Sequence, residues 1–149
     1  MKDKSKFVLG VLITMVATAL ILRGINFYTK NGVVEINHKV FRAEVVKEAW
    51  ELEKGLGGHK PLAENRGMLF VFPKEDYYQF WMKDMQFSID IIWINQGKIV
   101  DIKEKAPIPT THYLERYRPE APAKYVLEIG AGLAEKYGFK VGDAVKLDI

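Results

Sequence analysis

The chain has 149 residues, of which 48% are hydrophobic and 28% charged, a composition typical of a folded globular domain. Cysteine is absent, which excludes disulfides, thiolate metal sites, a cysteine nucleophile and cysteine-linked lipid anchors. The first 30 residues carry five bases and one acid, so the other 119 residues hold 17 bases and 18 acids. The basic balance of the chain therefore belongs to its N-terminal segment, and nothing in the charge favours nucleic acid as a partner.

The N-terminal segment is predicted to be a membrane anchor. An uncharged run of sixteen residues extends from Phe7 to Leu22, after three lysines and before Arg23. As a helix this run spans about 24 Å, and extending it to Tyr28 gives about 33 Å, enough for a hydrocarbon core of about 30 Å. The preceding lysines predict a single-pass protein with a cytoplasmic N-terminus and an extracytoplasmic domain.

Two alternatives to a retained anchor remain open. Ala17-Thr18-Ala19 fits the small-residue pattern of a signal-peptide cleavage site, although the apolar run continues beyond it. A buried core helix is the other alternative, disfavoured because the segment shows no polar face. We therefore expect residues 1–30 to be an anchor or signal peptide with a linker. Residues 31–149 are expected to form one extracytoplasmic β domain.

Short apolar runs separated by turn residues predict a mainly β domain with one or two short helices. Gly138 follows the second predicted helix, where it favours a left-handed C-cap, and Asn95-Gln96-Gly97 predicts an antiparallel hairpin. The expected fold class is a compact antiparallel β-sandwich or barrel-like domain. In chain order, strands are expected at residues 33–36, 40–46, 68–72, 77–82, 88–94, 98–103, 125–129 and 144–148, and helices at residues 47–54 and 131–137.

Asp90 is the most informative polar residue of the predicted strands. The strand at residues 88–94 carries apolar side chains on both faces, so it is expected inside the sheet, and Asp90 shares its face with Ile92 and Ile94. A buried carboxylate without a partner costs several kcal/mol or takes up a proton, so Asp90 should meet a lysine, backbone amides or a ligand. It is interpreted either as a structural carboxylate that ties down the loop at residues 82–87 or as one wall of a binding site.

Two further groups of residues are candidates for a site. Phe80-Trp81-Met82-Lys83-Asp84 places two aromatic rings beside a charged pair, an arrangement found both in ligand sites and at the edges of packed cores. Glu128 shares a face with Val126 and is expected either to face solvent or to form a carboxylate pair with Asp90. Such a pair would support glycoside hydrolysis, although two acidic residues anywhere in a sequence are enough to suggest this mechanism.

Other chemistry has less support in the sequence. His38, His59 and His112 show no metal-ligand spacing, so neither a metal nor a cofactor is predicted. No serine-nucleophile elbow or phosphate-binding loop is present. The proline-rich stretch at residues 106–123 is predicted to be a surface loop, long enough to have a role of its own.

Six segments from about Phe41 onwards carry a resemblance to a known family. They are Gly67-Met68-Leu69-Phe70-Val71-Phe72, Phe80-Trp81-Met82-Lys83-Asp84-Met85, Ile89-Asp90-Ile91, Pro122-Ala123-Lys124-Tyr125-Val126-Leu127-Glu128, Ala131-Gly132 and Val141-Gly142-Asp143. In order and spacing they resemble the domain of unknown function (DUF) 192 family. The family usually has Asn-Thr where this chain has Asp84-Met85, and Gly-Leu-Met where it has Gly55-Leu56-Gly57. The resemblance implies a compact β-sandwich or barrel-like fold, often exported or membrane-anchored, with no established activity. It implies that the ligand-binding candidates are Trp81, Met82, Lys83, Asp90, Glu128 and Asp143.

Three hypotheses of function follow. The leading one is a non-catalytic binding or accessory module for a cell-envelope glycan, peptide or protein, which it contacts near Trp81, Lys83 and Asp90. The second is a carboxylate-dependent hydrolase that acts on an envelope glycan with Asp90 and Glu128. The third is a structural subunit of a membrane complex that makes its contacts through residues 106–123.

Overall fold

The computed structural model describes residues 8–20 and 31–149, which fall into two units divided between Lys30 and Asn31. In the first unit, residues 8–20 are helical. Within the described ranges, none of the helices combines the length and the apolar character that crossing a bilayer requires. The predicted anchor also takes in Phe7 and residues 21–28, which lie outside the described residues.

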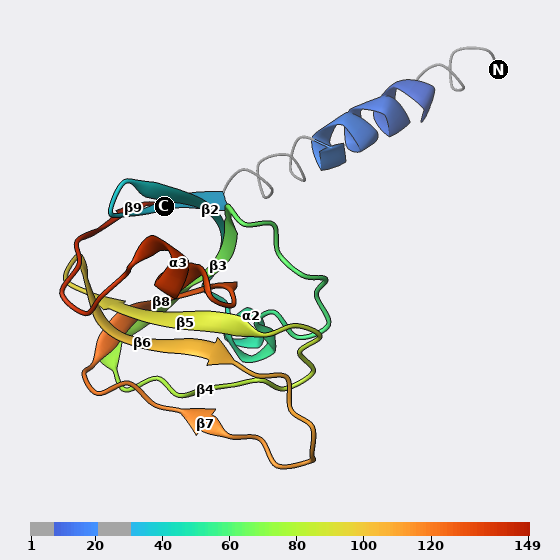
Figure 1. The fold of residues 1–149 in the computed structure, drawn as a ribbon. Coiled ribbons are helices and arrows are strands. Elements are labelled where there is room, and N and C mark those ends of the chain that lie inside the picture. The colour runs from blue at the N-terminus through green and yellow to red at the C-terminus, as the bar shows by residue number, and fades with distance from the viewer. Residues whose placement is uncertain (1–7, 21–30) are drawn as a thin grey trace. The chain divides into compact units, whose positions relative to one another are not determined.

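The second unit, Asn31–Ile149, is built on a seven-stranded sheet of order β6-β5-β8-β3-β2-β1-β9 (Figure 1). A separate two-stranded sheet pairs β4 with β7. Two short helices complete the unit. The elements are β1 (Asn31–Ile36), β2 (Lys39–Val46), α2 (Ala49–Lys54), β3 (Arg66–Asp76), β4 (Phe80–Trp81), β5 (Ile89–Asn95), β6 (Lys98–Ala106), β7 (Arg116–Tyr117), β8 (Ala123–Gly130), α3 (Leu133–Tyr137) and β9 (Val145–Asp148).

The large sheet curls into a half-barrel, so the barrel-like expectation is correct and the sandwich is not. At one end the two edges meet: Lys98 at the start of β6 forms an antiparallel bridge with Ala144, and the Val145 N–H donates to the Gly97 carbonyl at 2.8 Å. The sheet is also not wholly antiparallel, because β2 and β3 run parallel. The connection through α2 is long enough for the crossover that a parallel pair needs.

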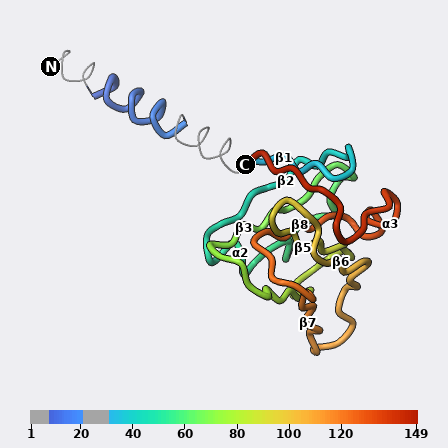
Figure 2. Tube along the Cα trace, turned by 90° about the vertical axis from the view of Figure 1, so that its left-hand side faces the viewer, coloured from blue at the N-terminus to red at the C-terminus, as the bar shows by residue number. Residues whose placement is uncertain are grey.

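Each face of the large sheet carries its own hydrophobic core. Along β5, Ile89, Ile91 and Trp93 belong to the first core, while Ile92 and Ile94 belong to the second, as the alternation of strand residues predicts. The first core includes residues that follow α2, and the second includes Ala134 of α3. Figure 2 shows the two helices on opposite sides of the sheet. Every buried aliphatic or aromatic side chain of β5 contributes about 1.5–3 kcal/mol to stability.

Two predicted turns are confirmed in detail. The β5–β6 hairpin turns through Gln96 and Gly97, whose φ angles are 47° and 70°. Both positive φ values fit a hairpin turn of the primed type, although Gln96 takes the left-handed position expected of Asn95. Helix α3 ends at Gly138, with φ of 66° and an N–H directed at the carbonyls of Ala134 and Glu135.

Two expectations about the remaining segments are wrong. The strand predicted at residues 77–82 contracts to β4, because β3 continues through an irregularity as far as Asp76. The stretch at residues 106–123 is not only a surface loop, since it contains β7 and buries Tyr117. Tyr117 lies opposite Phe80 in the small sheet, so pairing with β4 turns this ring towards the first core.

Candidate functional site

A cavity of about 230 Å³ opens on the α2 side of the large sheet. Its walls come from the end of α2 and the turn that follows, from β3, from the segment around β4, and from β8. It is slightly smaller than the 300–1,000 Å³ typical of sites for drug-sized ligands, so it suits a small molecule. The residues that line it are Leu52, Glu53, Lys54, Gly55, Leu56, Phe70, Phe72, Tyr78, Gln79, Phe80, Trp81, Lys83, Met85 and Glu128.

Glu128 is the buried acid of this cavity. Its place on β8, between Met68 of β3 and Ile91 of β5, turns its side chain towards the first core, and the residue is only 4% exposed. Among the described residues, no group donates a hydrogen bond to its Oε2 atom. Burial raises the pKa of Glu128 from 4.5 to about 8, so the carboxyl is mostly protonated at neutral pH. The cavity therefore contains a desolvated carboxyl group with unused hydrogen-bonding capacity.

Gly55 brings the backbone close to this carboxyl. It ends α2 with φ of 50°, a left-handed value that glycine adopts at little cost. A Cβ atom added at Gly55 would lie 3.9 Å from Glu128 Oε2 and 3.2 Å from Cζ of Phe70. A side chain at this position would therefore press against the Phe70 ring and lie against the carboxyl, which glycine avoids.

The turn after α2 is held against the loop that carries Lys83. The Gly58 N–H donates to the Asp84 carbonyl at 2.9 Å, and an added Cβ at Gly57 would lie 3.2 Å from the Lys83 carbonyl oxygen. Asp84 has φ of 57°, a region that Asn and Asp adopt more readily than other side chains. Gly57 and Asp84, two of the three residues that depart from the family pattern, are therefore neighbours in space.

Aromatic rings form much of the remaining wall. Phe80 contacts Phe70 edge to face at a centroid distance of 4.9 Å, and Phe72 stacks on Tyr78 at 3.5 Å. Phe80 is buried in the first core, whereas its neighbour Trp81 is half-buried beside the cavity. Of the two alternating aromatics of the predicted motif, one is thus core and the other borders the site.

The other two members of this motif separate in the same way. Lys83 is exposed and lines the cavity. Met82 is 2% exposed, belongs to the first core and is not among the lining residues of the cavity. Met82 instead borders a smaller space of about 180 Å³ under residues 107–117. The structure therefore brings Trp81, Lys83 and Glu128 together and leaves Met82 out.

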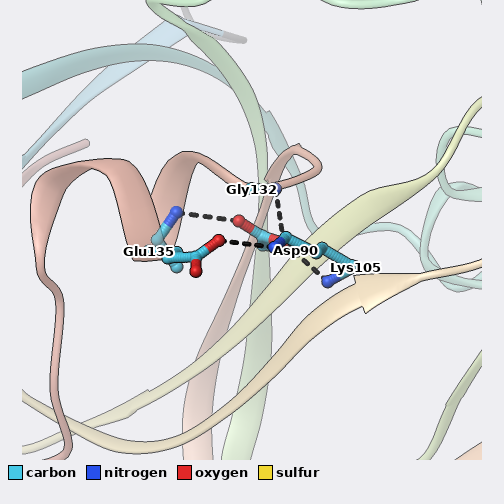
Figure 3. A network of polar contacts seen from close by, with 5 residues as sticks. Asp90, Lys105, Gly132 and Glu135 are labelled. Carbon is cyan, nitrogen blue, oxygen red and sulfur yellow. Dashed lines mark hydrogen bonds and ion pairs between the residues drawn. The ribbon is translucent and has the colours of Figure 1, made fainter.

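Asp90 lies on the opposite face of the sheet and is a structural carboxylate. It is fully buried, and three backbone N–H groups donate to it: those of Lys105 and Gly132 to Oδ1 at 2.8 and 2.9 Å, and that of Ala134 to Oδ2 at 2.8 Å (Figure 3). The side chain of Lys105 pairs instead with Glu135. Asp90 thus anchors the start of α3 and the end of β6, rather than the loop at residues 82–87.

Asp143 is also remote from the cavity lining. Its Oδ2 accepts hydrogen bonds from Nδ2 of Asn37 at 2.6 Å and from the Lys140 N–H at 2.9 Å. These bonds join the turn before β9 to the β1–β2 turn. Asp143 therefore has a role in connecting turns of the barrel end.

The predicted carboxylate pair does not form. In the β5–β8 register, Asp90 lies opposite Ile129 and Glu128 lies opposite Ile91, so the two acids point to opposite faces. Glu128 accordingly neither faces solvent nor meets Asp90, and hydrolysis by this pair is excluded. Among residues 8–20 and 31–149, no group of three or more histidine and acidic side chains is arranged to hold a metal ion.

The sequence did not point to the other cavity residues. Gly55, Phe70, Phe72 and Tyr78 all line the cavity, and none of them is among the site candidates that the sequence offers. The only available signal was the glycine-rich turn itself, since glycine often marks a close approach of backbone to a ligand.

The fold and the site define a small half-barrel domain with a buried carboxyl in an aromatic-lined pocket. Residues 32–147 match the DUF192 family, described as an uncharacterized ACR, and the chain belongs to this family. None of the curated proteins matches it.

Two solved structures are similar to the chain. One is a protein of unknown function from Novosphingobium aromaticivorans, 30% identical, with a TM-score of 0.67, covering 78% of this chain and 83% of its own. The other is a candidate transcription regulator from Sinorhizobium meliloti, 26% identical, with a TM-score of 0.67, covering 78% of this chain and 91% of its own. Both support the mainly β half-barrel fold.

Proposed function

We propose that this domain is a non-catalytic binding module that holds a small ligand in the cavity at Glu128. The observation that carries the proposal is the buried Oε2 atom, which has no hydrogen-bond donor among the described residues. Leaving such a group unpaired costs about 1–3 kcal/mol, and a ligand that donates to it recovers that cost. Ligand binding therefore gives this arrangement a purpose that core packing alone does not.

The surroundings of the carboxyl support the same proposal. Phe70, Phe80 and Trp81 offer apolar contact area, while exposed Lys83 and Lys54 supply charged groups on the lining. An apolar wall with a few convergent polar groups is the usual composition of a small-molecule site. Asp90 and Asp143 have no part in this proposal, because their hydrogen bonds are made within the fold.

Binding can be tested by nuclear magnetic resonance with the full chain and a panel of small cell-envelope sugars and peptides. We expect at least one compound to shift the amide signals of Gly55 and Glu128. Trp81→Ala should weaken that binding, and Glu128→Gln should weaken it by about tenfold, since one good polar contact is worth about 1.4 kcal/mol.

Tyr113→Ala is the matched control, because Tyr113 is an aromatic residue that is 78% exposed and does not line the cavity. It should leave the affinity unchanged. A panel in which no compound shifts the cavity signals, at concentrations up to millimolar, would contradict the proposal.

We also propose that the domain lies outside the cytoplasm and is held at the membrane by its N-terminal segment. The support is the uncharged run from Phe7 to Leu22 with lysines ahead of it. A C-terminal alkaline phosphatase fusion should be active, and the fusion should stay with the membrane after an alkaline wash. An inactive phosphatase fusion beside an active cytoplasmic reporter fusion would refute this placement.

A further inference from the structure

We infer that the ligand carries a cationic amine, whose ammonium group binds the Glu128 carboxylate beside the ring of Phe70. The inference rests on the proposed binding function and specifies the chemistry of the ligand. It follows from three features of the cavity: an acceptor without a donor, rings beside that acceptor, and a glycine at the point where the acceptor and a ring come together.

The first feature is the need for a donor at Glu128. Its Oε2 is buried and accepts no hydrogen bond from the described residues, while the cavity lies against it. A hydrogen bond between an ammonium and a carboxylate is roughly twice as strong as one between neutral groups. A cation also returns the electrostatic partner that burial removes from an ionised carboxylate. Because the free carboxyl is mostly protonated at neutral pH, an ammonium group that binds it as a carboxylate displaces its proton to solvent. At pH 7.5, just below the pKa of about 8, this displacement costs less than about 1 kcal/mol. Among possible donors, an amine therefore still gains the most from this position.

The second feature is the ring system around the carboxyl. Aromatic faces attract cations, with an energy of about 0.5–2 kcal/mol that rises as water is excluded. Rings on this side of the domain already make such contacts, because the Arg116 guanidinium lies 4.5 Å from the ring centroid of Trp81. Phe70, Phe80 and Tyr78 line the cavity itself. The rings of the lining thus supply apolar contact area for the carbons that carry the ammonium group.

The third feature is the position of Gly55. The position that a Cβ would occupy there lies 3.2 Å from Phe70 Cζ and 3.9 Å from Glu128 Oε2, so the ring and the carboxyl border the same volume. An ammonium group within hydrogen-bond distance of Oε2 therefore lies close to the edge of the Phe70 ring. Lys54 and Lys83 on the lining are exposed, so they favour a ligand whose outer end is neutral or anionic.

Benzylamine and benzyl alcohol provide a direct test, because they have nearly the same shape and differ in the charge of the donor. Each is titrated into the full chain at pH 7.5 and followed by calorimetry and by the amide signal of Gly55. We expect benzylamine to bind at least about tenfold more tightly than benzyl alcohol, the equivalent of about 1.4 kcal/mol. Glu128→Gln should abolish that preference.

Glu104→Gln is the matched control, since it removes an exposed acid that does not line the cavity and should keep the preference within about twofold. Equal binding of the two probes to the native chain would overturn the inference without the need for any variant. The inference would also be overturned if Glu128→Gln still bound benzylamine more tightly than benzyl alcohol. If the probes bind equally at the Gly55 signal, the proposed binding function stands and only the amine is wrong. If neither these probes nor the envelope panel reaches the cavity, both proposals fail.

Discussion

Replacing Glu128 with glutamine tests the central claim about the cavity, that it holds a neutral carboxyl. Glutamine has nearly the same size and no charge. In the folded chain, burial raises the pKa of Glu128 from 4.5 to about 8, while the unfolded chain keeps the ordinary value. Between these two pH values the folded state holds a proton that the unfolded state has lost. Native stability must therefore fall as the pH rises through this window.

The size of the effect follows from the width of the window. One bound proton changes the free energy of unfolding by about 1.4 kcal/mol for each pH unit. The interval from 4.5 to about 8 then corresponds to a loss of roughly 5 kcal/mol between acid and mildly alkaline solution. This contribution is fully present below pH 4.5 and has gone above pH 8. The variant Glu128→Gln lacks it at every pH.

Urea denaturation followed by tryptophan fluorescence, at pH values from 5 to 9, measures this contribution. Other groups titrate alike in both chains, so the difference in unfolding free energy between native and Glu128→Gln isolates the single carboxyl. As the pH rises, we expect the unfolding free energy of Glu128→Gln to increase by several kcal/mol relative to that of the native chain. The unfolding free energy of Glu53→Gln should show no such relative increase. Parallel native and Glu128→Gln curves from pH 5 to pH 8 would show that the carboxyl is not held neutral by burial, and the reasoning would be refuted.

Three further predictions concern the fold. Asp90→Ala should lower the unfolding free energy by about 3 kcal/mol or more, because three backbone N–H groups lose their acceptor, and urea denaturation measures this. Gly138→Ala should cost about 1 kcal/mol, seen as a lower melting temperature, since alanine disfavours a φ of 66°. Phe80→Ala should cost about 3–5 kcal/mol by the same denaturation, because it removes a buried ring from the first core; a loss under 1 kcal/mol would contradict that placement.

The elements that periodicity determines were predictable from the sequence. The alternation along residues 88–94 indicated an interior strand with two apolar faces, and β5 has this arrangement, with Asp90 beside Ile92. The glycines at Gly97 and Gly138 indicated the hairpin and the end of α3 because each residue occupies a backbone conformation that other residues avoid. These features depend on residues that are neighbours along the chain, so they can be predicted without knowledge of the tertiary contacts.

What depended on contacts between distant residues was not predictable. The parallel pairing of β2 with β3 follows from the path of the chain through α2, which the apolar pattern does not encode. The role of Glu128 could not be predicted without the register between β5 and β8, because this register places Glu128 and Asp90 on opposite faces of the sheet. Of the ligand-binding candidates that the resemblance implied, Trp81, Lys83 and Glu128 line the cavity. Met82, Asp90 and Asp143 do not, and Asp143 instead holds a turn.

The opposite orientation of the two buried acids has a consequence for how β5 and β8 align during folding. If either strand slipped by one residue, its buried acid would move to the opposite face of the sheet. There it would enter a hydrophobic core that offers it no hydrogen-bond partners. A displaced Asp90 would lose three amide donors, and a displaced Glu128 would enter the second core, among Leu127 and Ile129. Each error costs several kcal/mol. The same two side chains that stand out chemically in the finished domain therefore also penalise its nearest misaligned alternatives.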